Sequence, residues 1–221
     1  MTAEPGRWDI EFDVRIPGWL EIPRLSGADH EGFADGAVAD LPELLGDSWS
    51  PEREPLARDI IRQGLEQRDD STDFAFQVWS RQIDAVASVE VRFGSAAGMP
   101  DFAADGYRVR PTDMATNIGP GFEAVLTRQM QFEDEDLPVV TVAHALFVFS
   151  DGDSALVVEV EPTPVDLLRV VMIGLGGLLD SLTITASDGT RFSTVPDDPL
   201  VALDTIWPQP KDEAAGGAEN D

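Results

Sequence analysis

The sequence predicts an α+β protein: an antiparallel β-sheet of about six to eight strands flanked by helices, similar to an α/β/α sandwich. Three observations support this class. Apolar and polar residues alternate with a period of two in several short segments. Turn-forming residues such as Ser-Asp-Gly-Asp at positions 150–153 join some of these segments directly. Two other segments repeat apolar residues at helical spacing.

The first predicted strand covers residues 11–16, in which Phe, Val and Ile alternate with charged residues, and Pro17 ends it. Residues 24–50 are rich in Gly, Asp and Pro. That composition predicts a long loop with one short helical turn near residues 41–45. Together with the helix that follows, we expect residues 24–70 to form an insertion in the domain.

The first predicted helix begins at Ser50, which has the chemistry of an N-cap and precedes a proline at the first helical position. Apolar residues recur at helical spacing until the charged cluster at Arg68, and Gly64 lowers the helix propensity between them. This pattern predicts one buried face. The strands predicted after this helix cover residues 73–80, 85–93, 107–110 and 122–132.

Residues 139–149 are apolar on both faces of the predicted strand, with His144 as the main polar interruption. This profile is typical of a central strand that is covered on both sides. The turn at residues 150–153 then predicts a hairpin to an alternating strand at residues 155–161.

Thr163 and Pro164 have the pattern of a helix start, and a broad apolar face follows them. Gly174, Gly176 and Gly177 lie within this predicted helix. We expect these glycines to allow a close approach of the helix to the sheet. The last predicted elements form a closing hairpin of residues 182–185 and 191–195.

We expect residues 1–208 to form a single domain and residues 209–221, which lack periodicity, to form a disordered acidic tail. The N-terminus lacks the apolar core of a signal peptide. The longest apolar run, residues 170–179, is shorter than the ~20 residues that span a bilayer. These features predict a cytoplasmic protein without membrane insertion.

The net charge of the chain limits the kinds of partner that it can bind. The chain has 42 acidic and 15 basic residues, a net charge of −27, and no cysteine. The absence of cysteine excludes disulfides and thiol chemistry. The negative charge should repel nucleic acid, so we expect no nucleic-acid partner. Two readings of the acidity stay open: a solubility feature, or an acidic face for a basic partner.

No segment carries a convincing catalytic constellation, so we predict no catalytic, cofactor-binding or metal-binding residues. His30 lies between acidic residues but lacks metal-ligand spacing. His144 is expected to be a buried structural histidine with a hydrogen-bonded partner. The acidic runs at residues 134–136 and 151–153 predict turns, not calcium loops. The glycine-rich residues 173–177 fall inside a predicted helix, which argues against a dinucleotide loop.

Two segments resemble the PsbP-like fold family, which includes the extrinsic photosystem II subunit, a Ran-binding nuclear import factor and many actinobacterial proteins of unknown function. Phe12-Asp-Val-Arg-Ile-Pro-Gly-Trp19 is similar to the family's opening strand and Pro-Gly-Trp turn. Asp180-Ser-Leu-Thr-Ile184 is similar to the end of its final helix and the strand that follows. The family has no shared active site. The resemblance therefore implies a non-enzymatic, partner-binding scaffold.

We therefore expect a non-enzymatic cytoplasmic interaction or accessory protein with an unknown protein partner, assisting a secretion or envelope system. Two alternatives stay open. One is a small-molecule-binding or hydrolytic enzyme that uses carboxylates in a cleft between the sheet and residues 24–70. This alternative predicts a concave pocket with at least two convergent acids of perturbed pKa. The other is an acidic protein that engages a basic partner.

Overall fold

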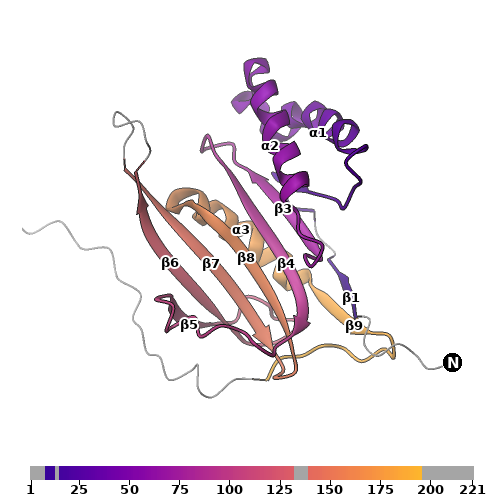
Figure 1. The fold of residues 1–221 in the computed structure, drawn as a ribbon, viewed down its shortest axis with the longest axis vertical. Coiled ribbons are helices and arrows are strands. Elements are labelled where there is room, and N and C mark those ends of the chain that lie inside the picture. Colours follow the sequence, from indigo (N-terminus) through magenta and orange to yellow (C-terminus); the bar gives the residue numbers. More distant parts are fainter. Residues whose placement is uncertain (1–7, 13–14, 132–138, 196–221) are drawn as a thin grey trace, which may run out of the picture.

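The computed structural model describes residues 8–12, 15–131 and 139–195, which form antiparallel sheets with helices (Figure 1). The strands are β1 (Trp8–Glu11), β2 (Trp19–Glu21), β3 (Phe74–Trp79), β4 (Val86–Ser95), β5 (Arg108–Thr112), β6 (Gly121–Met130), β7 (Val140–Ser150), β8 (Ser154–Pro164) and β9 (Thr183–Ala186). The helices are α1 (His30–Leu45), α2 (Glu54–Gln67) and α3 (Val165–Ser181), with two short 3₁₀ helices, η1 (Gly46–Ser48) and η2 (Pro51–Arg53), between α1 and α2.

Within these residues, seven strands form one antiparallel sheet in the order β2–β3–β4–β8–β7–β6–β5, and β1 pairs with β9 in a second sheet. The α+β antiparallel class predicted from the sequence is therefore confirmed. β7 lies inside the sheet, between β8 and β6, as its two apolar faces predict.

The main hydrophobic core lies between α3 and one face of the large sheet; Figure 1 shows α3 behind β7 and β8. Val89 of β4, Phe147 of β7 and Val158 of β8 project from this face and are fully buried. Buried apolar residues at helical spacing, such as Leu175, line the side of α3 that covers these strands. Ile184 of β9 joins the same core.

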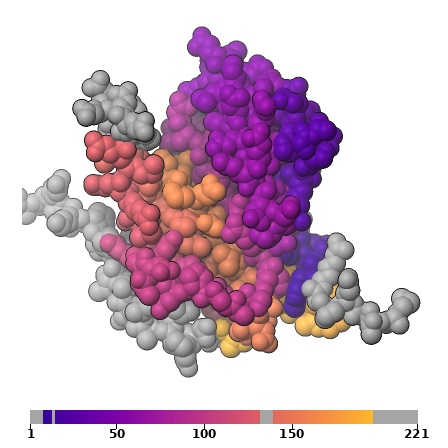
Figure 2. Space-filling model, in the orientation of Figure 1, coloured from indigo at the N-terminus to yellow at the C-terminus, as the bar shows by residue number. Residues whose placement is uncertain are grey.

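The opposite face of the sheet is covered at its two ends. α1 and α2 pack against each other and against Ala75 and Trp79 of β3, which alternate with residues that face the main core. At the other end, Phe102 packs against Leu146 and Val148 of β7. In Figure 2, orange atoms from the C-terminal part of the chain reach the surface between the purple helical pair and the magenta segment before β5. The middle of this face therefore remains accessible.

Helix α1 occupies much of the region predicted as a long loop. The sequence predicts only a short turn near residues 41–45, whereas the helix begins at His30 and contains Pro42. That prediction is wrong because the segment, although rich in Gly and Asp, also carries mostly small apolar side chains at helical spacing along one face. Packing of this face against α2 outweighs the low helix propensity. The buried residues of α1 are Ala34, Ala37, Val38, Leu41 and Leu45.

The first strand lies earlier than predicted. The sequence predicts a strand at residues 11–16, but β1 covers Trp8–Glu11, and residues 13–14 lie outside the described residues. The Trp8 ring packs edge-on against Phe93 and Phe192, with centroid distances of 5.2 and 6.2 Å. These aromatic contacts favour the observed position of the strand over the one that alternation predicts.

The predicted closing hairpin of residues 182–185 and 191–195 forms only in part. β9 is present, but Arg191 makes a single bridge to Thr185, and no strand follows it within the described residues. Instead, Phe192 is buried in the main core. β9 uses its other edge to pair with β1, which provides the pairing partner that the sequence pattern did not indicate.

The hairpin turn between β7 and β8 is confirmed. The Asp151 carboxylate accepts hydrogen bonds from the backbone N–H groups of Asp153 (3.0 Å) and Ser154 (2.7 Å). Gly152 adopts φ = +98°, a conformation that favours glycine. Two other predicted features, the acidic turn at residues 134–136 and the tail at residues 209–221, lie outside the described residues.

Alanine at Gly174 is expected to destabilise the protein by about 1–3 kcal/mol through overpacking. A Cβ atom there would lie 2.5 Å from Trp19 Nε1 and 3.0 Å from Ile16 Cγ2. The close approach expected of the glycines in α3 is thus confirmed at Gly174. It is wrong at Gly177, where a Cβ would meet nothing within 4 Å.

Gly177 supplies the control for this prediction. Alanine there changes only helix propensity and is expected to stabilise the protein by about 0.5–1 kcal/mol. Urea denaturation of both variants measures the free energies of unfolding. Shifts of the same sign and size would contradict the close packing of α3 against Trp19.

Candidate functional site

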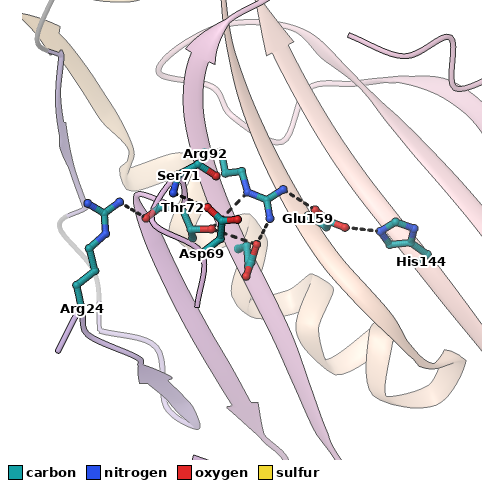
Figure 3. A network of polar contacts seen from close by, with 8 residues as sticks. Arg24, Asp69, Ser71, Thr72, Arg92, His144 and Glu159 are labelled. Atoms are coloured by element: carbon teal, nitrogen blue, oxygen red, sulfur yellow. Dashed lines mark hydrogen bonds and ion pairs between the residues drawn. The ribbon is translucent and has the colours of Figure 1, made fainter. Parts of the chain in front are cut away.

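A row of polar side chains crosses the large sheet on the face opposite α3, in its accessible middle (Figure 3). The strand register places Glu90 of β4 directly opposite Glu159 of β8. His144 of β7 lies at an irregularity in the β7–β8 register between Ala143 and Ala145. Such bulges re-aim side chains. We call Thr72, Glu90, Arg92, Tyr107, His144 and Glu159 the polar stripe.

Arg92 lies at the centre of the polar stripe. Its guanidinium forms ion pairs with Glu90 and, at 2.9 Å, with Glu159, and donates a hydrogen bond to Thr72 Oγ1 at 3.3 Å. The exposed fractions of the side chains are 39% for Arg92, 14% for Glu90 and 22% for Glu159. Two carboxylates directly opposite each other on neighbouring strands repel. One arginine therefore bridges the two carboxylates that the register brings together and offsets part of their repulsion.

His144 links Glu159 to Tyr107. Its Nε2 lies 2.8 Å from Glu159 Oε1, and its Nδ1 lies 2.7 Å from the Tyr107 hydroxyl. An ionised carboxylate only accepts hydrogen bonds, so Nε2–H donates to Glu159. In the neutral imidazole, Nδ1 then accepts from the Tyr107 hydroxyl. The hydrogen-bonded partner predicted for His144 is confirmed, although the side chain is partly exposed instead of buried.

The protonation states of this chain are set by its contacts. The hydrogen bond from His144 lowers the pKa of Glu159 below its usual value; burial opposes this shift, and the charge of Arg92 assists it. Burial, together with the negative charge of Glu159, raises the pKa of Tyr107. Both shifts run away from neutrality. Near pH 7, Glu159 is ionised and the phenol of Tyr107 keeps its proton.

Arginines also fix the end of the polar stripe that lies towards β2. Arg24 donates to the Thr72 carbonyl at 2.5 Å. Arg68 donates to the carbonyl oxygens of Ile22 and, at 2.8 Å, of Asp73. Burial and the nearby charge of Arg24 lower the pKa of Arg68. These bonds hold the connection between α2 and β3 against the sheet edge.

A pocket of about 180 Å³ lies at the other end of the polar stripe. We call it the His144 pocket. Tyr107 and His144 contribute its polar surface together with Arg128, an exposed residue of β6. The apolar lining residues are Leu126, Val142 and Pro162.

Two larger surface pockets lie elsewhere. One, of about 460 Å³, is lined mainly by apolar residues that include Trp19, Leu44 and Leu178. The other, of about 370 Å³, lies near the junction of α1 and α2, where Arg53 and Asp84 pair at 3.1 Å. Because these two charges are already paired, this pocket presents a balanced polar surface.

The acidic segment around His30 does not form a site. His30 begins α1, and Glu31 pairs with Arg62 at 3.2 Å. Asp29 accepts a hydrogen bond from Ser26. Among the described residues, no cluster of acidic and histidine side chains has the arrangement of a metal site. The described helices, α3 included, all fall short of the length and apolar composition needed to cross a bilayer.

Sequence reasoning missed most of the polar stripe. The alternation of residues 85–93 indicates that Glu90 and Arg92 share the polar face, and the next hairpin places Glu159 on an alternating strand. Tyr107, in contrast, reaches His144 from the segment before β5. No local pattern predicts that contact, because it depends on strand order.

The fold and the polar stripe define an α+β protein with a charged, partly enclosed sheet face. Comparison of the chain with protein-family models, with curated proteins and with solved structures found no match. The resemblance to the PsbP-like family therefore stays a prediction.

Proposed function

We propose that this chain is a non-enzymatic protein that binds a protein partner through the polar stripe and the His144 pocket. The geometry of the polar stripe carries this proposal: Glu90 and Glu159 pair with Arg92, and His144 is hydrogen-bonded to Glu159 and Tyr107. General acid–base catalysis works best when the pKa of the group lies near the operating pH. Here one pKa is lowered and the other raised, both away from neutrality. The groups therefore form a fixed pattern of charges and hydrogen bonds that suits recognition.

The same contacts weigh against the carboxylate enzyme as an alternative. Glu90 and Glu159 do converge, but they converge on Arg92 and not on an empty position. The lowered pKa of Glu159 keeps it ionised, which makes it a poor proton donor at neutral pH. The pair supports an ion-paired surface better than a catalytic pair of carboxylates.

The composition of the surface also suits a binding role. Arginine and tyrosine are enriched at the energetic centres of protein interfaces. Arg92, Arg128 and Tyr107 all lie on or beside the accessible face. Met130, which alternation places on the same face of β6 as Arg128, is 44% exposed.

As part of the same proposal, the protein acts in the cytoplasm as an accessory of a secretion or envelope system.

Reversing the charge at Arg128 is expected to abolish partner binding without unfolding the protein. Arg128→Glu changes an exposed residue of β6 on the sheet face that carries the polar stripe, which we call the stripe face. The tagged protein is captured from its own cells at near-physiological salt, and co-purified proteins are quantified. We expect a stoichiometric partner with the original sequence and loss of that partner with Arg128→Glu.

The same strand provides a matched control. Thr127 and Gln129 flank Arg128, are exposed, and point to the opposite face of the sheet. The double variant Thr127→Glu/Gln129→Glu makes the same total charge change there and should retain the partner. Retention of the partner by Arg128→Glu, or equal loss in both variants, would refute the stripe face as the binding surface.

A second candidate function is binding of a basic partner by the acidic helical pair. Exposed carboxylates on the surfaces of α1 and α2 favour it: Asp40, Glu43, Asp59 and Glu66. Three further carboxylates there, Glu31, Asp35 and Glu54, are ion-paired with Arg62 or Arg58. At physiological ionic strength, salt largely screens the interaction between exposed charges that lie more than ~8 Å apart, so binding between charged surfaces weakens as salt is added. Capture that weakens steeply with salt, and that survives Arg128→Glu, would favour this candidate over the polar stripe.

A further inference from the structure

We infer that the His144 pocket is a subsite for a carboxylate group carried on a small apolar body. This inference rests on the proposed binding function and names the chemistry that one end of the surface recognises. The pocket joins a cationic side chain, Arg128, to an apolar lining made by Leu126, Val142 and Pro162. A ligand that matches both must have an anionic end and an apolar part.

The hydrogen-bond donors of the other polar side chains in the pocket are already used. The Nε2–H of His144 donates to Glu159, and its Nδ1 accepts from the Tyr107 hydroxyl. The guanidinium of Arg128 has five N–H donors. Within the described residues, it forms no ion pair or hydrogen bond. Arg128 is therefore the group in this pocket that can donate to a ligand.

The charge of Arg128 acts within the pocket. It opposes the rise in the pKa of Tyr107 that burial and Glu159 produce, so Arg128 lies close enough to act on the Tyr107 hydroxyl. A guanidinium binds a carboxylate through two parallel N–H···O bonds, which are about twice as strong as neutral hydrogen bonds. An ammonium ligand would instead meet repulsion from Arg128.

The surrounding charge and the pocket size narrow the ligand further. Glu159 is hydrogen-bonded to the pocket residue His144, and the chain carries a net charge of −27. Both disfavour a dianion such as a phosphate monoester more than a monoanion. The volume of about 180 Å³ equals that of roughly six water molecules at ~30 Å³ each. This space suits a phenyl-sized or branched aliphatic body.

Benzoate is the probe for this subsite. We expect its addition to the full-length ¹⁵N-labelled protein to shift the backbone amide signals of Leu126 and Val142 in NMR spectra. Benzamide, which has the same shape without the charge, should bind about tenfold more weakly or not at all, since it lacks the charge-assisted pair. Arg128→Gln should weaken benzoate binding by a similar factor.

Arg169→Gln is the matched control, because Arg169 is an exposed arginine of α3 that does not line the pocket. It should leave benzoate binding unchanged. Equal binding of benzoate and benzamide, or benzoate binding that survives Arg128→Gln, would overturn the carboxylate subsite. So would the absence of any benzoate-induced shift at millimolar concentration.

A second arm separates two sources of the carboxylate. Short peptides that end in phenylalanine are compared as free acids and as C-terminal amides. Tighter binding of the free-acid peptide than of benzoate assigns the subsite to a partner's chain terminus. Equal affinities assign it to a free monocarboxylic acid. If benzoate does not bind but partner capture is still lost in Arg128→Glu, the subsite is rejected and the proposed function is kept. If benzoate binds as expected but partner capture does not depend on Arg128, only the protein-partner function is rejected.

Discussion

Replacing Phe147 with alanine is expected to lower the free energy of unfolding by about 3–5 kcal/mol. Phe147 is fully buried in the interior strand β7, in the core between the sheet and α3. Truncation removes the transfer free energy of the ring and leaves a cavity that the two layers cannot fully close. Because domains are typically stable by only 5–15 kcal/mol, this loss is a large part of the total.

Chemical denaturation followed by tryptophan fluorescence measures this change. Ile173→Ala on the outer surface of α3 is the control, since Ile173 is 83% exposed and should change stability by no more than about 0.5 kcal/mol. If Phe147→Ala were as mild as Ile173→Ala, Phe147 would not be packed between the sheet and α3, and the layer arrangement would be wrong.

The position of β7 also illustrates what the sequence can predict. Its run of apolar residues, interrupted by His144, indicates a strand covered on both faces, and the structure places it inside the sheet. The alternation in β4 and the apolar face of α3 are equally local signals. Each depends on residues within one element, so strand and helix periodicity are sufficient to predict them. The helix start predicted at Thr163 and Pro164, in contrast, is wrong, because β8 extends to Pro164 and α3 begins at Val165.

The features that the sequence does not predict depend on distant partners. α1 is recognisable as a helix only when its small buried residues, such as Ala34 and Ala37, are seen against α2. The polar stripe joins residues as far apart in the chain as Thr72 and Glu159. The irregular β7–β8 register at His144 is a further non-local feature. Strand order and register, which create the site, are not encoded in any single segment.

Replacing Arg92 with methionine is expected to destabilise the protein by about 2–3 kcal/mol at pH 7. Removing one partner of a buried ion pair costs about 3–5 kcal/mol, and the partial exposure of Arg92 reduces this figure. The variant leaves Glu90 and Glu159 opposite each other without a cation. Methionine keeps much of the apolar volume, so the loss reports mainly on charge.

The effect should depend on pH in a defined direction. The folded-state pKa of Glu159 is lowered from the ordinary value of 4.5, first by the hydrogen bond from His144 and then by the charge of Arg92. Its contribution to stability is therefore present above pH 4.5 and is lost as pH falls through the folded-state pKa. The difference in stability between the original protein and Arg92→Met should be largest near neutrality and should shrink in acid. A difference that does not change between pH 7 and pH 3 would contradict the electrostatic account.

A second substitution separates the two roles proposed for Arg92. Glu90→Gln removes one of the two opposed carboxylates, so the double variant Arg92→Met/Glu90→Gln should recover part of the stability lost by Arg92→Met. Without such recovery, repulsion between the carboxylates cannot explain the destabilisation. If the double variant folds stably but no longer captures the partner, Arg92 presents charge to that partner in addition to neutralising its neighbours. If it folds and still captures the partner, Arg92 only maintains the sheet face, and recognition must lie with the groups around the His144 pocket.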